Sequence, residues 1–177
     1  MEKLNLVATG GTFDCIHIGH IKLLSTAFDI SHHVIIGLTS DRFVKRYKLT
    51  STIKNNYLRR LVNLKENISL HFKEANYTII KLEDEFGPVI HSSQIQGIVV
   101  SEETLVKVKQ INEIRISKYL EPLQVIVIEI AKSSDGKPIS STRIRNGEID
   151  NKGKILMKWK ISQFFFIRNG LKVIVFW

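Results

Sequence analysis

The stretch of sequence that decides the fold is LNLVATGGTFDCIHIGH, residues 4–20. It begins with a short apolar run, Leu4–Ala8, which predicts a buried strand, and an amphipathic helix is expected from about Gly19. Two adjacent glycines and two histidines lie between or beside these elements. Because ligands of doubly wound α/β proteins bind where strands end and helices begin, this junction is the first place to look for a site.

The rest of the chain repeats the alternation of strand and helix. Four more buried strands are predicted, at Val34–Leu38, Thr78–Leu82, Gly97–Ser101 and Val125–Ile130. Helical spacing is found over about 55–68 and about 103–118, and a short helix is expected after Ser140. In the helix at 103–118, the residues expected to face inward are Leu105, Val108, Ile111 and Ile114. The pattern predicts an α/β fold with a Rossmann-like, doubly wound, parallel five-stranded sheet.

Length and composition are those of one ordinary globular domain. The chain has 177 residues, of which 44% are hydrophobic and 24% charged, which excludes collagen-like, disordered and polytopic membrane proteins. The single cysteine, Cys15, cannot form an intramolecular disulfide, and the first residues lack the apolar region of a signal peptide. We therefore predict a cytoplasmic protein.

The formal net charge of +9 is unevenly distributed. Most of the excess lies in residues 151–177, which contain no acidic residue. The basic residues there are Lys152, Lys154, Lys158, Lys160, Arg168 and Lys172. The remaining, nearly balanced body suits a small anionic substrate, so no nucleic-acid partner is expected.

The C-terminal part of the chain differs in composition from the rest. We divide the sequence into a domain at 1–153 and an apolar, basic extension at 154–177. Two β-prone runs, 164–167 and 171–176, flank an Asn-Gly pair, which predicts a β-hairpin. Neither run has the roughly 20 apolar residues of a membrane span. An edge hairpin, an oligomer contact, a poorly ordered extension and a membrane-surface attachment all remain open.

The junction after the first strand has the chemistry of an anion site. Gly10 and Gly11 allow a phosphate to approach the backbone, and a helix N-terminus attracts negative charge. His17 and His20 are three residues apart at the start of the helix, so both can reach one ligand. The sequence lacks the P-loop and dinucleotide-binding patterns, and the spacing of Cys15, His17 and His20 matches no common zinc site.

Two motifs carry a resemblance to a known superfamily. Gly11–His20 reads GTFDxxHxGH and Ile139–Arg145 reads ISSTxIR, and together they resemble the two signatures of the HxGH nucleotidyltransferases. Within that superfamily, several further segments are similar to the archaeal phosphopantetheine adenylyltransferases. These segments are Ile36–Asp41, Phe86–Pro88, Val99–Thr104, Ile111–Arg115 and Asp135–Pro138.

The resemblance covers residues 4 to about 153 and implies an activity. An adenylyl group would pass from ATP, accompanied by Mg²⁺, to 4′-phosphopantetheine, giving dephospho-coenzyme A and pyrophosphate. Three alternatives remain: a nicotinamide-mononucleotide adenylyltransferase, a cytidylyltransferase, and a nucleotide-binding module without catalysis. The resemblance leaves open whether the protein is a monomer or a homo-oligomer.

The same resemblance assigns catalytic roles to individual residues. Thr12 would lie between the acceptor phosphate and the α-phosphate, and His20 would contact the phosphates of ATP. His17 joins them, although the bacterial enzymes have threonine at this position. Lys45, or Lys48 as the alternative, would contact both substrates.

The resemblance implies that the remaining assigned residues would bind the nucleotide. They are Gly11, Phe13, Ser101, Arg115, Ser140, Ser141, Thr142 and Arg145, together with His20. Cys15 lies inside the first signature, but the reaction needs no thiolate, so we expect this residue to be a spectator.

Overall fold

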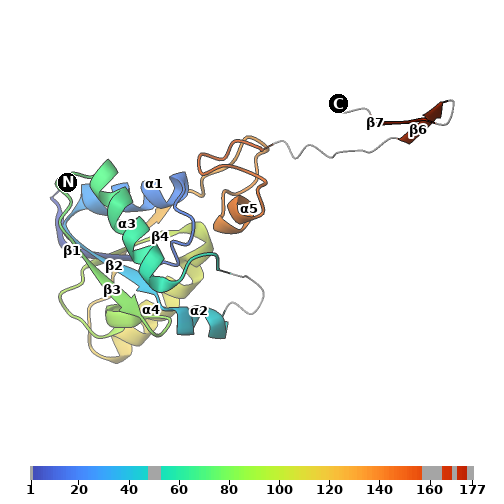
Figure 1. The fold of residues 1–177 in the computed structure, drawn as a ribbon. Helices are drawn as coiled ribbons and strands as arrows, with labels where there is room; N and C mark the ends of the chain where they lie inside the picture. The colour runs from blue at the N-terminus through green and yellow to red at the C-terminus, as the bar shows by residue number, and fades with distance from the viewer. Residues whose placement is uncertain (1, 48–52, 157–164, 169–170, 175–177) are drawn as a thin grey trace.

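The computed structural model describes residues 2–47, 53–156, 165–168 and 171–174, and Figure 1 shows their fold. Five strands form one parallel sheet in the order β3-β2-β1-β4-β5. Their bounds are β1 Leu4–Gly11, β2 Ser31–Thr39, β3 Tyr77–Leu82, β4 Gly97–Ser101 and β5 Gln124–Ile128. The predicted doubly wound sheet is confirmed, and its switch point lies between β1 and β4.

Strands β1 and β2 extend further than their apolar runs predict. Residues 9–11 of β1 pair in register with residues 36–38 of β2. A Cβ atom on Gly10 would lie 3.1 Å from the carbonyl oxygen of Gly37, so the two strands approach closely where a side chain is missing. The two glycines therefore belong to the strand, and the loop toward the first helix begins at Thr12.

Helices cover both faces of the sheet (Figure 1). On one face, α1 (Ile18–Ile30) and α3 (Tyr57–His71) pack against a core cluster that includes Val7 of β1 and Val99 of β4. On the other, α4 (Leu105–Ser117) and the 3₁₀ helix η1 (Gly87–Ile90) pack against a cluster that includes Ala8 and Val100. Neighbouring strand residues thus point to opposite faces, as the pleat requires.

Shorter helices lie at the edge where the strands end. They are α2 (Asp41–Tyr47), the 3₁₀ helix η2 (Glu102–Thr104) and α5 (Ser141–Arg145). The sequence predicts α5 but not α2, which follows β2 after a single residue. That residue, Ser40, accepts a hydrogen bond from the backbone N–H of Phe43, as an N-cap side chain does.

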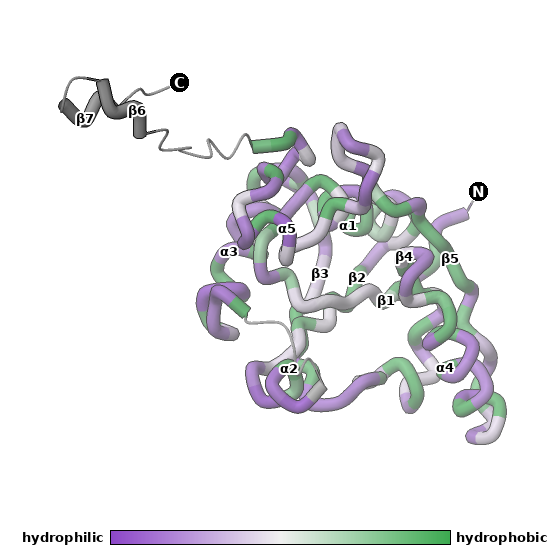
Figure 2. The backbone as a smooth tube through the Cα atoms, turned by 90° about the vertical axis from the view of Figure 1, so that its right-hand side faces the viewer, coloured by the Kyte–Doolittle hydropathy of each residue, from purple (hydrophilic) through white to green (hydrophobic). Residues whose placement is uncertain are grey.

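The prediction that Leu105 faces inward is wrong, since this side chain is exposed. Helix α4 begins after the 3₁₀ helix η2 that follows β4, and Val106 in the same first turn is exposed as well. Val108 and Ile111, further along, are buried as predicted. Hydrophilic and hydrophobic residues alternate along the tube of α4 in Figure 2.

The predicted C-terminal hairpin is also confirmed. Strand β6 (Phe165–Arg168) pairs antiparallel with β7 (Leu171–Ile174). The predicted strand residues 164, 175 and 176 and the Asn-Gly pair at 169–170 lie outside the described residues. Backbone pairing ties residues 154–156 to the domain, including a bridge between Ile149 and Ile155.

Among the helices that the structure describes, none combines the length and apolar character needed to cross a bilayer.

Candidate active site

A cavity of about 500 Å³ lies at the carboxyl edge of the sheet, beside the switch point. Its walls come from the ends of the strands, the starts of α1 and α5, and one face of η1 and α4. This volume is typical of a small-molecule site. The predicted site residues that line it are Gly11, Thr12, Phe13, His17, His20, Ser101, Ser140, Ser141, Thr142 and Arg145. The two signature motifs, more than a hundred residues apart, therefore meet at one cavity.

Phe13 bends the loop between β1 and α1. Its backbone has a positive φ of 48°, which is uncommon for a residue with a bulky side chain. The ring is buried and lies 4.9 Å from the ring of His20, centroid to centroid. A Cβ atom on Gly11 would lie 3.2 Å from this ring, so the second glycine leaves room for it. The loop is thus held in a strained conformation, a feature that concentrates at functional sites.

The two histidines form a stacked pair at the start of α1. Their ring centroids are 3.8 Å apart with an interplanar angle of 26°. His17 is the N-cap residue of α1, with extended backbone. Burial lowers the pKa of His17 to about 4, so this imidazole is neutral near pH 7. Its Nδ1 atom is buried and has no hydrogen-bond partner among the described residues.

Helix α5 is fastened to the loop after β1 by hydrogen bonds. The hydroxyl of Ser141 accepts from the backbone N–H of Cys15 at 3.3 Å and donates to its carbonyl oxygen at 3.2 Å. Ser140 is the N-cap of α5, and its hydroxyl accepts from the backbone N–H of Arg143. The serines of the second signature thus start the helix and join it to the first signature.

Arg145 is held at the cavity by a buried carboxylate. Its guanidinium donates to Asp14 Oδ2 at 2.6 Å and to the hydroxyl of Thr142 at 3.0 Å. Asp14 is buried and also accepts from the backbone N–H groups of Lys54 and Asn55. Asp14 therefore fixes the position of a cation that lines the cavity.

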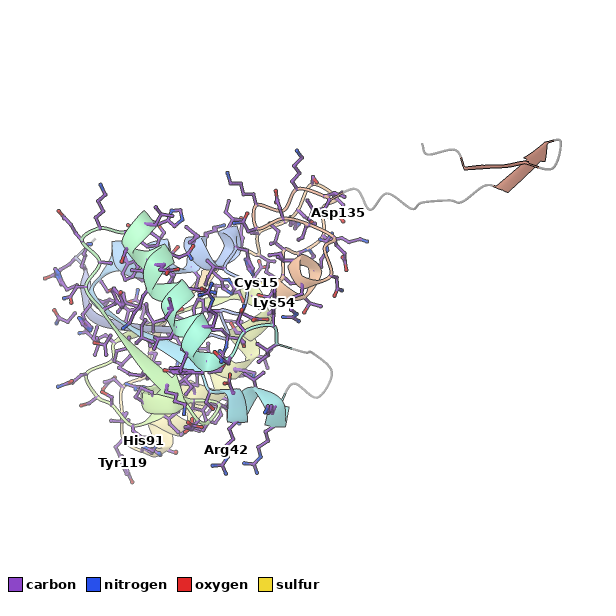
Figure 3. All side chains as sticks on the ribbon, viewed as in Figure 1. Cys15, Arg42, Lys54, His91, Tyr119 and Asp135 are labelled. Atoms are coloured by element: carbon purple, nitrogen blue, oxygen red, sulfur yellow. The ribbon has the colours of Figure 1, made fainter. Side chains whose placement is uncertain are left out.

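A second charged cluster orders the loop that leads into α5, where Arg143 donates to Asp135, the residue labelled on this loop in Figure 3. A hydrogen bond from the Ser133 hydroxyl and the guanidinium of Arg143 lower the pKa of Asp135 to about 2. Arg143 also forms an ion pair with Glu148 at 3.0 Å. Gly136 adopts a φ of 77° within this loop, so the turn uses the freedom of glycine.

The structure corrects the assignment of Arg115 to the nucleotide side. Its side chain is buried in α4, does not line the cavity and donates to the carbonyl oxygens of Val89, Ser92, Ile95 and Glu121. All its donor nitrogens are engaged with the backbone. The family motif that contains Arg115 therefore packs η1 and α4 together.

The predicted phosphate-contacting lysine does not line the cavity either. Lys45 lies on α2, and its side chain is exposed. Phe43, on the same helix, does line the cavity. Lys48, the alternative, lies outside the described residues.

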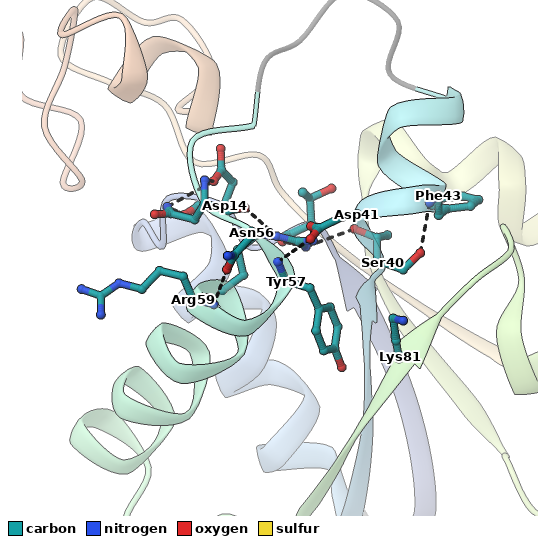
Figure 4. A network of polar contacts seen from close by, with 12 residues as sticks. Asp14, Ser40, Asp41, Phe43, Asn56, Tyr57, Arg59 and Lys81 are labelled. Carbon is teal, nitrogen blue, oxygen red and sulfur yellow. Dashed lines mark hydrogen bonds and ion pairs between the residues drawn. The ribbon is translucent and has the colours of Figure 1, made fainter.

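Arg60 is a residue that the sequence interpretation missed. It is fully buried at the start of α3, and its guanidinium reaches the backbone of Thr12 and the carboxylate of Asp41, both at 2.8 Å. Figure 4 shows the polar network around Asp14, Asp41 and Tyr57. A signal was present in the sequence: Arg60 stands four and eight residues before Leu64 and Ile68, on the inward face of an amphipathic helix. A charged residue at such a position requires buried partners.

Cys15 has the properties of an unreactive thiol. It is half-buried, and burial followed by the neighbouring Asp14 charge raises its pKa. No group of three or more His, Cys, Asp or Glu side chains suited to a metal ion occurs in the described part of the chain.

The fold and the cavity together are those of a nucleotidyltransferase of the Rossmann-like class. The features that indicate this class are the five-stranded parallel sheet, the glycine-rich first junction with its two histidines, and the serine-capped helix at the same cavity. The cytidylyltransferase-like family model matches residues 8–147. A phosphopantetheine adenylyltransferase from Methanothermobacter thermautotrophicus is 40% identical over 161 residues, which cover 89% of this chain and 93% of the relative. One from Pyrococcus horikoshii is 42% identical over 151 residues, covering 85% and 94%.

The chain belongs to the cytidylyltransferase-like family and, within it, to the phosphopantetheine adenylyltransferases. Among solved structures, a protein of unknown function from Archaeoglobus fulgidus has a TM-score of 0.62 and 27% identity, with coverage of 72% of this chain and 89% of that one. A pantoate-beta-alanine ligase from Francisella tularensis, with a TM-score of 0.52 and 12% identity over 81% of this chain and 65% of its own, shares the fold.

Proposed function

We propose that the protein transfers the adenylyl group of ATP to the phosphate of 4′-phosphopantetheine, releasing pyrophosphate and forming dephospho-coenzyme A. The observation that carries the proposal is the cavity at the switch point, whose lining combines polar residues of the two signatures with apolar residues of the strands, η1 and α4. We call these two sets of lining residues the polar half and the apolar half. The family relationship to phosphopantetheine adenylyltransferases supports the choice of substrates.

The polar half suits the triphosphate of the nucleotide. It contains the start of α1, His20, Thr12 and Arg145. Helix N-termini and cations attract phosphate, and a neutral imidazole such as that of His17 can donate a hydrogen bond without a proton transfer. We assign to His20 and Arg145 the role of stabilising the negative charge that builds on the phosphates during transfer.

The apolar half suits the long, neutral arm of the acceptor. Residues of β2, β3, β4, η1 and α4 supply this apolar lining, including Ile35, Leu82, Val89, Val100 and Val108. The charged residues Asp84, Glu85, Glu103 and Lys107 line the same cavity. In this arrangement the arm runs along the sheet toward η1 and α4, and its phosphate end reaches Thr12 at the boundary of the two halves.

The chemistry requires alignment more than proton transfer. An acceptor phosphate is already ionised near neutral pH, so its oxygen attacks the α-phosphorus directly while the bond to the β-phosphate oxygen breaks and pyrophosphate leaves. The task of the protein is to hold the two anions in line and to stabilise the added charge. Thr12 orients the acceptor phosphate in this proposal.

Mg²⁺ enters as part of the nucleotide substrate. The carboxylate at the polar half, Asp14, already accepts bonds from Arg145 and from two backbone N–H groups. Phosphate oxygens and water are the ligands Mg²⁺ prefers when a protein offers no dedicated cage. The nucleotide-side residues Ser101 and Ser140–Thr142, which line the cavity, complete the proposed set.

The test is a matrix of donors and acceptors followed by pyrophosphate release. ATP and CTP are each offered with 4′-phosphopantetheine, nicotinamide mononucleotide or glycerol 3-phosphate. Of these pairs, only ATP with 4′-phosphopantetheine is expected to give turnover. Preference for CTP or for another acceptor identifies a different transferase of the superfamily, and no turnover with any pair identifies a non-catalytic nucleotide-binding module.

A further inference from the structure

We infer that Arg60 is a positioning residue, which holds the loop of Thr12 and helix α2 at the separation that aligns the two substrates. The inference rests on the proposed function, because it concerns the geometry of that reaction. Arg60 does not line the cavity, so it acts through residues that do.

The guanidinium of Arg60 joins three segments of the chain. Nη1 donates to the carbonyl oxygen of Thr12 at 2.8 Å, and Nη2 donates to Asp41 Oδ1 at 2.8 Å. Nε donates to the carbonyl oxygen of Asn55 at 3.2 Å. These partners belong to the loop after β1, the first residue of α2 and the segment before α3.

The contact with Thr12 fixes the loop where the proposed reaction takes place. Thr12 follows the two strand glycines and precedes the strained Phe13, so its carbonyl oxygen lies at the point where the chain leaves the sheet. Rotation of this peptide would move the Thr12 side chain and the Phe13 ring together. A buried guanidinium on the carbonyl oxygen prevents that rotation.

The contact with Asp41 fixes α2, which carries Phe43 in the cavity wall. Asp41 Oδ2 also accepts from the backbone N–H of Tyr57 at 2.9 Å. Burial would raise the pKa of Asp41, but the hydrogen bonds from Tyr57 and Arg60 outweigh it and lower the pKa. The carboxylate is therefore charged near pH 7, and it bridges α2 to both Arg60 and the start of α3.

Two aspartates that follow different strands thus accept hydrogen bonds from the same segment, residues 54–57. Asp14, after β1, accepts from the backbone N–H groups of Lys54 and Asn55, while Asp41, after β2, accepts from that of Tyr57 (Figure 4). Arg60 closes the network, because it contacts the backbone of Asn55, the carboxylate of Asp41 and the loop of Thr12. One side chain therefore connects the segments that follow β1 and β2.

The functional consequence follows from the sensitivity of transfer reactions to distance. Displacing a reacting group by about 1 Å can cost about 100-fold in rate. Arg60 connects the loop of Thr12 to α2 through the carboxylate of Asp41. Lysine cannot replace it, since a single ammonium nitrogen lacks the fork that reaches separated acceptors.

The experiment compares Arg60→Lys and Asp41→Asn with the wild type by steady-state pyrophosphate release from ATP and 4′-phosphopantetheine. We expect Arg60→Lys to lower kcat about 10- to 100-fold while the KM of each substrate stays within about threefold. Asp41→Asn preserves the shape of a side chain that is partly exposed, so this variant is expected to lower kcat less than Arg60→Lys does. The double variant should match Arg60→Lys, because both changes break one link.

The matched control is Leu64→Ala, one turn further along α3. Leu64 is fully buried and does not line the cavity, so its truncation weakens the same helix without touching Thr12 or Asp41. All assays are run well below each variant's melting temperature, and circular dichroism confirms folding. If Arg60→Lys does not fold, Asp41→Asn carries the comparison.

The outcomes separate the two proposals. A kcat loss in Arg60→Lys or Asp41→Asn that exceeds the loss in Leu64→Ala supports the positioning role. An active wild type whose polar variants match Leu64→Ala, or lose only ATP affinity, overturns the role of Arg60 and leaves the proposed function intact. A wild type that releases no pyrophosphate overturns the proposed function and the inference with it.

Discussion

Two fully buried arginines lie on opposite faces of the sheet and serve different halves of the cavity. Arg60 on α3 contacts Thr12, which lines the cavity, and Asp41, the first residue of α2. Arg115 on α4 contacts backbone carbonyl oxygens of the η1 region and of Glu121. A buried arginine thus positions the loop of Thr12 on one face of the sheet, and another supports the apolar wall of the cavity on the other face. The partners of a buried cation, more than its motif, reveal its role.

The largest expected effect lies in the polar half, at His20. Replacing it with alanine should lower kcat by about 100-fold or more, because one donor to the developing phosphate charge is lost. Steady-state kinetics with ATP and 4′-phosphopantetheine measure this effect. Near-normal turnover of the variant would mean that His20 takes no part in the chemistry and that the polar half has no larger role in catalysis than the apolar half.

The stacked partner of His20 should make stability depend on pH. In the unfolded chain a histidine titrates near pH 6.5, whereas the pKa of His17 in the native state is about 4. Between these values the unfolded state binds a proton that the native state does not, so stability falls as the pH is lowered from about 6.5 to about 4. The full loss is of the order of 3 kcal/mol.

His17→Gln should remove this slope. Urea unfolding of the wild type and the variant between pH 7 and pH 4 gives the comparison. Parallel stability curves would mean that His17 is not held neutral by the fold.

Arg115→Lys tests the other half of the comparison. Lysine cannot satisfy the four separated carbonyl oxygens, so the variant should lose about 2–4 kcal/mol of stability. Because those carbonyls lie behind the apolar wall, any kinetic change should fall on the KM of the acceptor. Thermal unfolding and kinetics below the melting temperature measure both. A tenfold rise in the KM of ATP would restore the nucleotide role that the motif suggested.

The smallest effects are expected outside both halves. Cys15 contacts Ser141 only through its backbone, so Cys15→Ser should keep turnover within about twofold. An excess of Mg²⁺ together with a zinc chelator should leave both proteins active. Loss of activity in the variant and in the chelator test would revive a thiol or metal role.

The C-terminal extension should likewise be dispensable for turnover. Residues up to 156 are hydrogen-bonded to the domain, so a chain ending at Leu156 is the appropriate truncation. Its turnover should stay within about threefold, while its melting temperature or its mass in solution changes. A soluble, folded truncation with a hundredfold loss would show that the extension completes the site.

The sequence predicted the sheet because its strands are encoded locally. The assignment of both signatures to one nucleotide site came from the resemblance to the superfamily, since their meeting is a tertiary contact. Apolar runs of strand length identified each strand, and the glycines and histidines marked the junction between β1 and α1. Helix α2 was missed because it depends on a cap at Ser40 and on Asp41 binding to residues far along the chain. Arg60 and Arg115 were missed or misassigned for the same reason, since the acceptors of a guanidinium are set by tertiary contacts.

The most direct test of the central claim follows the α-phosphate itself. ATP labelled at the α-phosphorus is incubated with the protein and 4′-phosphopantetheine, and the products are separated. The label is expected in dephospho-coenzyme A, in amounts equal to the pyrophosphate released. Label that stays in ATP, or that appears in AMP with pyrophosphate release independent of the acceptor, would contradict adenylyl transfer between the two halves of the cavity.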